Sequence, residues 1–150
     1  MKVSRQRTVG ASVEEAWRLV SDPYNLPRWW PRAARVENVE KRGSGRRSQW
    51  TMVLETSEGR GVRADFRCTS AAEGERYVWE QQLEGTPFEK HLRASRVEIG
   101  LRGGAGEGTE VSLSSTQTLR GMSRLGSPLM RRGQREILDA ALDGIEGALT

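Results

Sequence analysis

The sequence predicts an α+β protein in which an antiparallel sheet wraps around one long C-terminal helix. Three observations lead to this prediction. Residues 128–149 carry an amphipathic pattern that would make a helix roughly 33 Å long at about 1.5 Å per residue. Several segments between residues 34 and 119 alternate polar and apolar side chains with the period of two that is typical of strands. Only short turns separate these segments, as expected for neighbouring antiparallel strands.

The terminal helix has a recognisable start and one apolar face. Ser127 is a suitable N-cap, and Pro128 suits the first helical position, where a missing N–H costs nothing. The apolar residues share one arc of the helical wheel: Met130, Ile137, Leu138, Ala141, Leu142, Ile145, Ala148 and Leu149. Such a face requires a large apolar surface to lie on, and the preceding strands provide it.

The chain begins with one strand and two short helices. Residues 2–9 alternate as a strand does, and Ser12–Glu15 forms a capping box that opens a helix with apolar residues at helical spacing up to Val20. A second short helix, residues 24–29, leaves Trp29 and Trp30 at a bend. We expect the two helices to close one end of the core; in the functional alternative, one of them lines the mouth of a cavity.

The middle of the chain consists of strands and turns, which bring the sheet to about six or seven strands. The further strands are expected at 35–40, 48–54, 62–68, 76–83, 88–102 and 111–119. Turns are expected at Gly43–Gly45, 58–59, 72–75 and Gly103–Gly108. The last of these is glycine-rich like a phosphate-binding loop, but it lies between two strands, which favours a hairpin turn.

Composition restricts the function further. A chain of 150 residues is expected to form one domain, residues 1–150. The net charge is +4, but the arginines are scattered among acidic residues, which argues against a nucleic-acid partner. We expect no membrane span, no signal peptide and, with Cys68 as the single cysteine, no internal disulfide, which together favour a cytoplasmic location. One cysteine and one histidine leave few soft ligands, so we expect no metal and no cofactor.

Residues 11–31 (ASVEEAWRLVSDPYNLPRWWP) and 118–149 (TLRGMSRLGSPLMRRGQREILDAALDGIEGAL), together with the order of elements, resemble the START-like helix-grip superfamily that includes polyketide cyclases and dehydrases (SRPBCC). The resemblance covers nearly the whole chain. It implies a curved antiparallel sheet that grips the C-terminal helix, often with a hydrophobic cavity between them. Members bind lipids, sterols, polyketides or plant hormones, and a minority catalyse cyclisation. The family has no universal catalytic motif, so the resemblance assigns no catalytic residue.

A candidate ligand-binding set follows from the strand phases. Large rings and polar side chains share the inward phase of the predicted sheet, and Gln134 and Ala141 lie on the inner face of the helix. The full set is Trp50, Met52, Phe66, Tyr77, Trp79, Gln81, Gln117, Gln134 and Ala141. These residues could form an ordinary core. However, buried glutamines require hydrogen-bond partners, which a ligand or waters in a cavity would supply.

The register of residues 88–102 decides whether a titratable group joins this set. Val97, Ile99 and Leu101 should face inward, and the same phase extended backwards turns His91 and Arg93 inward as well. A β-bulge near residues 94–96 would instead place both on the surface. His91 is the first suspect for proton transfer, because its unperturbed pKa lies closest to neutrality.

Five arginines near the start of the terminal helix form the densest basic cluster: Arg120, Arg124, Arg131, Arg132 and Arg135. They could mark an anionic partner or form a solvated face with pairs such as Arg132–Glu136.

Three functions remain open on the sequence alone. The first is the binding of a small hydrophobic, lipid-, polyketide- or aromatic-like ligand in a cavity between sheet and helix. The second is a polyketide cyclase or dehydrase that acts by positioning and proton transfer. The third is a protein-interaction module with a collapsed cavity. Binding leads, because no acid–base pair is recognisable; the ligand and the oligomeric state stay open.

Overall fold

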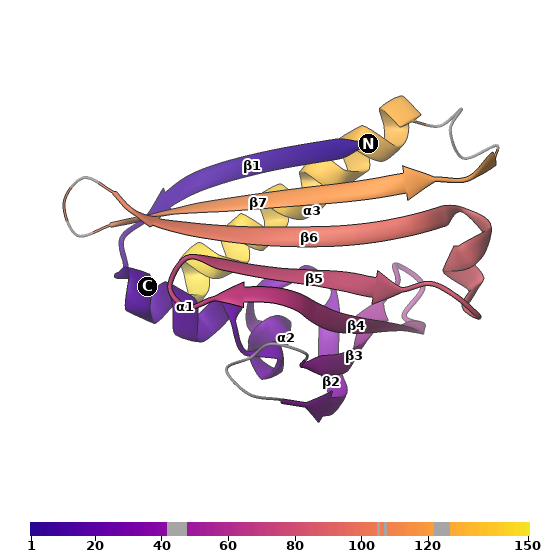
Figure 1. Ribbon diagram of the computed structural model, residues 1–150, viewed down its shortest axis with the longest axis horizontal. Helices are drawn as coiled ribbons and strands as arrows, with labels where there is room; N and C mark the ends of the chain where they lie inside the picture. The colour runs from indigo at the N-terminus through magenta and orange to yellow at the C-terminus, as the bar shows by residue number, and fades with distance from the viewer. Residues whose placement is uncertain (42–47, 105, 107, 122–126) are drawn as a thin grey trace.

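The computed structural model confirms the α+β prediction. It describes residues 1–41, 48–104, 106, 108–121 and 127–150. One seven-stranded antiparallel sheet has the order β1-β7-β6-β5-β4-β3-β2 (Figure 1). Its strands are β1 Lys2–Val9, β2 Ala33–Glu40, β3 Gln49–Glu55, β4 Gly61–Ala72, β5 Arg76–Gln82, β6 Leu92–Gly103 and β7 Thr109–Leu119. The helices are α1 Val13–Val20, η1 Pro23–Asn25, α2 Leu26–Trp29, η2 Pro87–Lys90 and α3 Ser127–Ala148, where η marks a 3-10 helix.

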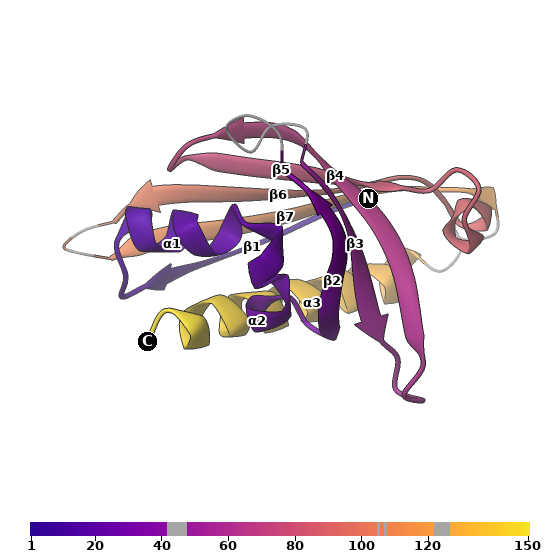
Figure 2. The same cartoon turned by 90° about the horizontal axis from the view of Figure 1, so that it is seen from below.

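The sheet curves around α3, and all three α-helices lie on its concave side (Figure 2). The first strand pairs with the last, with Val3 opposite Ser115. The segment α1–η1–α2 therefore carries the chain from the β1 edge to the β2 edge, after which each strand pairs with the next. No helix in the described part of the chain has the length and apolarity that a membrane crossing requires.

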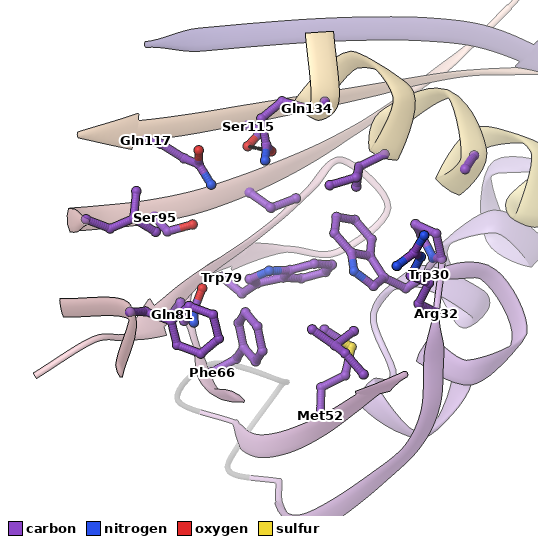
Figure 3. Close-up of a pocket in the computed structure, with 18 of the residues that line it drawn as sticks. Trp30, Arg32, Met52, Phe66, Trp79, Gln81, Ser95, Ser115, Gln117 and Gln134 are labelled. Carbon is purple, nitrogen blue, oxygen red and sulfur yellow. Dashed lines mark hydrogen bonds between the residues drawn. The ribbon is translucent and has the colours of Figure 1, made fainter. Parts of the chain in front are cut away.

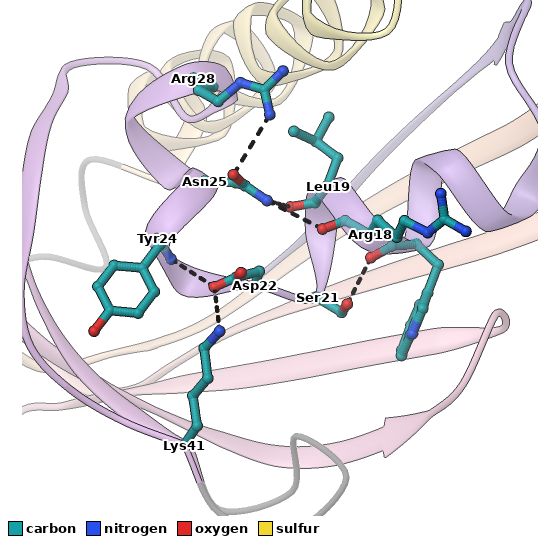
Figure 4. Close-up of polar contacts among 9 residues, drawn as sticks. Arg18, Leu19, Ser21, Asp22, Tyr24, Asn25, Arg28 and Lys41 are labelled. Carbon is teal, nitrogen blue, oxygen red and sulfur yellow. Dashed lines mark hydrogen bonds and ion pairs between the residues drawn. The ribbon is translucent and has the colours of Figure 1, made fainter.

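Local hydrogen bonds fix the path through the short helices, and the capping box predicts the first of them. The Ser12 hydroxyl accepts a bond of 3.1 Å from the backbone N–H of Glu15. The Asp22 carboxylate accepts a bond of 3.0 Å from the Tyr24 N–H and lies 3.0 Å from Lys41 Nζ (Figure 4). The Asn25 side chain donates to the carbonyls of Arg18 and Leu19 (Figure 4). This tie joins the end of α1 to the start of α2, whose Trp29 backbone contacts α3 at Gly144.

The C-terminal half of α3 is packed without space. Leu138, Ala141, Leu142 and Ile145 are at most 1% exposed. At Gly144 the helix meets the backbone of α2 so closely that a Cβ there would overlap the carbonyl oxygen of Trp29. The contact therefore requires glycine for its size, not for a special backbone conformation.

Ion pairs hold the outer side of the same helix against β1. Arg5 lies 3.3 Å from Asp139, and Arg7 lies 2.6 Å from Asp143. Because these groups are partly exposed, each pair contributes about 0–1 kcal/mol. The pairs orient α3, while burial of its apolar face supplies most of the stabilisation.

Some expectations need correction. The first three residues of the expected strand 88–102 belong instead to η2, Pro87–Lys90, and the strand itself begins at Leu92. The second short helix divides into η1 and α2. Strand β4 extends to Ala72, with an irregularity between Cys68 and Ser70. The turn at 43–45 and Arg124 lie outside the described residues.

The Gly144 contact makes a sharp stability prediction. Gly144→Ala should lower the free energy of unfolding by about 1–3 kcal/mol, because the added methyl group forces α2 and α3 apart. Gly147→Ala is the matched control: a Cβ there meets nothing within 4 Å. It should leave stability unchanged or raise it by up to about 1 kcal/mol through helix propensity. Urea denaturation measures both; equal effects of the two substitutions would contradict the close contact.

Candidate functional site

A cavity of about 580 Å³ lies between the sheet and the N-terminal half of α3 (Figure 3). Its helix wall consists of Gly133, Gln134, Glu136, Ile137 and Ala140, which share a stripe at helical spacing. This stripe lies beside the one that packs into the core, so a single amphipathic helix serves both the core and the cavity. The size suits a drug-sized molecule.

One wall of the cavity is aromatic. Trp30, Phe66, Trp79 and Phe88 line it, with Met52, Leu54, Leu92 and Val97 filling the spaces between them. Trp79 is the centre of the group: its ring lies 5.3 Å from that of Trp30 in an edge-on arrangement and 6.5 Å from that of Phe66. These packed rings form a stiff apolar surface, because their rotamers are fixed by their neighbours.

A second wall of the cavity is polar but uncharged. It consists of Gln81, Ser95, Ser115, Gln117 and Gln134, from strands β5, β6 and β7 and from α3. Gln81 is the cross-strand partner of Phe66, so the polar wall adjoins the aromatic one. The strand register explains their meeting, because Ser95 pairs with Gln117 and Val97 with Ser115. The Ser115 hydroxyl donates a hydrogen bond of 2.9 Å to the Gln134 side-chain oxygen.

Gln117 differs from its neighbours on this wall. Its side-chain oxygen is buried and has no hydrogen-bond partner in the described part of the chain. The indole N–H groups of Trp29 and Trp50 are also buried without a partner there, but neither residue lines the cavity. A buried acceptor without a partner is costly, about 1–3 kcal/mol, and a donor group on a ligand would remove that cost.

The cavity mouth carries a single arginine among the described lining residues, Arg32. It lies in the link between α2 and β2 with φ 63°, a left-handed conformation that is uncommon for residues other than glycine. Figure 3 shows its guanidinium beside Trp30. The other ionisable lining residue, Glu136 on α3, lies 3.3 Å from Arg132 of the same helix.

Six of the nine predicted ligand-binding residues line the cavity: Met52, Phe66, Trp79, Gln81, Gln117 and Gln134. The structure places the other three elsewhere. Trp50 and Tyr77 lie in the core beneath the aromatic wall, stacked with their rings 6.5 Å apart. Ala141 lies on the core stripe of α3 and is fully buried, whereas the cavity stripe is one step around the helix.

A β-bulge in β6 decides which side chains of residues 88–102 face the cavity. Leu92 pairs with Leu119 and Ala94 with Thr118, so Arg93 is an extra residue, slightly earlier than the expected 94–96. The inward phase therefore changes from Leu92 to Ser95 and Val97. Arg93 is exposed, and His91, at the end of η2, is also exposed and is not among the lining residues.

Sequence reasoning missed the residues that the loops supply. Phe88 reaches the cavity from η2, and Pro31 and Arg32 reach it from the α2–β2 link. The Trp29–Trp30 bend was the one available signal for that link. Nothing in the pattern predicts a left-handed arginine, because such a conformation depends on tertiary packing.

The lining offers little acid–base chemistry. Among the described residues that line the cavity, only Arg32 and Glu136 are ionisable. The nearby Tyr77 hydroxyl stays neutral, because burial and then the adjacent Cys68 thiol raise the pKa of Tyr77 far above its usual value. The described residues also contain no group of three or more metal-ligating side chains.

Comparison with known proteins agrees with this geometry. The family described as polyketide cyclase / dehydrase and lipid transport matches residues 1–150. A START superfamily protein from Mycobacterium smegmatis has a TM-score of 0.80 at 19% identity, over 99% of this chain and 96% of that one. The Zhui aromatase/cyclase from Streptomyces sp. R1128 has a TM-score of 0.75 at 16% identity, over 99% of this chain and 93% of that one.

A two-domain aromatase/cyclase from the steffimycin pathway, StfQ, has a TM-score of 0.79 at 17% identity, and the match covers 99% of this chain and 50% of that one. No curated protein matches the sequence. At these identities the solved structures establish the helix-grip fold and nothing finer.

The unpartnered Gln117 oxygen predicts an unusual mutational result. Gln117→Leu should leave the free energy of unfolding unchanged or raise it by up to about 1 kcal/mol, because it removes a buried acceptor that has no donor. Gln134→Leu, the matched control on the same wall, should lower it by about 1–3 kcal/mol, because the buried Ser115 hydroxyl loses its partner. Urea denaturation of both variants is the measurement. A loss for Gln117→Leu as large as the control's would show that Gln117 has a structural role.

Proposed function

This chain belongs to the polyketide cyclase / dehydrase and lipid transport family, and we propose that it binds a small hydrophobic, ring-containing molecule in the cavity between sheet and α3 without changing it chemically. The observation that carries this proposal is the chemistry of the lining. None of the described residues that line the cavity is a histidine, cysteine, aspartate, tyrosine or lysine, and the one glutamate, Glu136, is exposed and paired with Arg132. General acid–base catalysis needs a group of this kind within hydrogen-bond reach of the reacting atoms.

The shape and polarity of the cavity support a ring-containing ligand. Trp30 is half-buried and offers a ring against which a planar ligand can pack, and such aromatic contacts are worth about 0.5–1.5 kcal/mol beyond burial. Trp79 is only 2% exposed and contacts the Trp30 ring edge-on. The polar wall of amides and hydroxyls suits a few oxygen substituents. A purely aliphatic lipid would leave the buried Gln117 oxygen without a partner.

A second function, cyclisation or dehydration of a polyketide, is favoured by the likeness to two aromatase/cyclase structures. The same polar wall could hold the carbonyl oxygens of a folded poly-β-ketone and act by positioning alone. The third function, a protein-interaction module, assumes a collapsed cavity, and the volume of about 580 Å³ supports ligand binding over it.

The binding proposal is tested with a neutral naphthalene dye, N-phenyl-1-naphthylamine. It should bind the folded protein at about one dye per chain and quench tryptophan emission, because Trp30 and Trp79 line the site. Gly133→Phe should abolish binding without unfolding the protein: Gly133 lines the cavity, and a Cβ there meets nothing within 4 Å. A fluorescence titration alongside near-ultraviolet circular dichroism measures both effects.

Two variants serve as controls. Gly147→Phe adds the same ring on the exposed side of α3, and His91→Gln removes the one histidine; both should keep dye affinity within about twofold of the wild type. If Gly133→Phe and Gly147→Phe weaken the dye equally, or the folded wild type does not bind it, the cavity is not the binding site.

A further inference from the structure

We propose that Arg32 makes the mouth of the cavity an anion-recognition site, so that the ligand is a ring system bearing an acidic oxygen group such as a carboxylate or sulfonate. This inference rests on the proposed function, since it assigns a charge to the molecule that the cavity binds. Three properties of Arg32 support it: its position at the cavity, its backbone conformation and its lack of an ion pair in the described part of the chain.

The backbone holds Arg32 at the mouth. The Ala33 N–H donates a hydrogen bond of 3.3 Å to the Trp30 carbonyl, and the Glu55 N–H donates one of 2.8 Å to the Arg32 carbonyl. The turn is therefore tied both to itself and to the end of strand β3. A residue other than glycine adopts φ 63° only where its surroundings impose that conformation, and such positions cluster at binding sites.

The positive charge of the Arg32 guanidinium is not neutralised by a partner in the described part of the chain. No ion pair and no side-chain hydrogen bond joins it to any residue in the described ranges, although most arginines nearby are engaged. Arg35 and Arg63 both bind Glu37 on the outside of the sheet. The Glu136 carboxylate pairs with Arg132, and no ion pair joins it to Arg32 in the described part of the chain. A ligand oxyanion would therefore meet an uncompensated cation, which can form two parallel N–H···O bonds with a carboxylate.

The positions of the polar groups would also orient such a ligand within the cavity. In Figure 3, Arg32 and Gln117 lie on opposite sides of the cavity, with the ring of Trp79 between them. A ring-containing molecule held in the cavity between them can place its anionic group at Arg32 and a hydroxyl group at the unpartnered Gln117 oxygen. The two polar contacts would fix the orientation of a ring that apolar contacts alone would let rotate.

Two dyes with one skeleton test the charge requirement. The dye 8-anilino-1-naphthalenesulfonate is N-phenyl-1-naphthylamine with one added sulfonate. The wild type should bind the sulfonate dye more tightly than the neutral one. Arg32→Gln should weaken the sulfonate dye by about five- to tenfold and leave the neutral dye within about twofold. Arg32→Lys should fall between, because it keeps the charge but loses the planar fork.

Arg18→Gln is the matched control. Arg18 is exposed on α1, is not among the lining residues, and its loss changes the net charge equally. It should leave both affinities within about twofold, since the field of a distant exposed charge is screened beyond about 10 Å at ordinary salt. Equal weakening of the sulfonate dye by Arg18→Gln and Arg32→Gln, or no weakening by Arg32→Gln, would overturn the anion site. Failure of the neutral dye to bind the wild type would instead overturn the proposed function itself.

Discussion

The contact between α2 and the C-terminal half of α3 is the constraint on which the cavity depends. Because Gly144 has no side chain, the backbone of Trp29 reaches the helix surface, and the apolar stripe from Leu138 to Ile145 closes against the sheet. The N-terminal half of the same helix is packed only in part, through Met130 against a small apolar cluster and through Gln134 against Ser115 on β7. Between these contacts its surface lines the cavity. A rigid half of α3 thus supports a half that can accommodate a ligand.

The groups around that space are less well satisfied than those of the core. Gln117 keeps a buried oxygen without a partner, and Arg32 occupies a strained backbone conformation with no ion pair in the described chain. Both features cost stability in the unliganded protein. Natural proteins retain such costs where function requires them, since stability needs only to exceed a threshold. The binding account explains both features by one ligand, whereas a purely structural account leaves them without a cause.

Local sequence patterns predicted most of the helices and strands. Which residues line the cavity depends on tertiary packing, which such patterns do not contain. The capping box at Ser12–Glu15 and the alternation of β7 act over a few residues, so the sequence contains them in full. A helical wheel identifies the apolar face of α3 but not which part of it meets the sheet, so Ala141 was expected at the cavity where Gly133 lies. The outward position of His91 depends on one extra residue in β6, and the periodicity of that segment is compatible with both registers. No sequence pattern predicts the position of Arg32, because its turn conformation is imposed by tertiary packing and not by the residue itself.

The central claim is that the cavity holds a ring-containing molecule and returns it unchanged. The most direct measurement is native mass spectrometry of the purified protein after incubation with a small-molecule extract of the cells that produce it. The bound compound is then released and its mass is compared with the masses in the extract. The account predicts one acidic, aromatic compound per chain, with the same mass before and after binding. A released compound that has lost a molecule of water, or otherwise differs from everything in the extract, would contradict it and identify the protein as a cyclase or dehydrase.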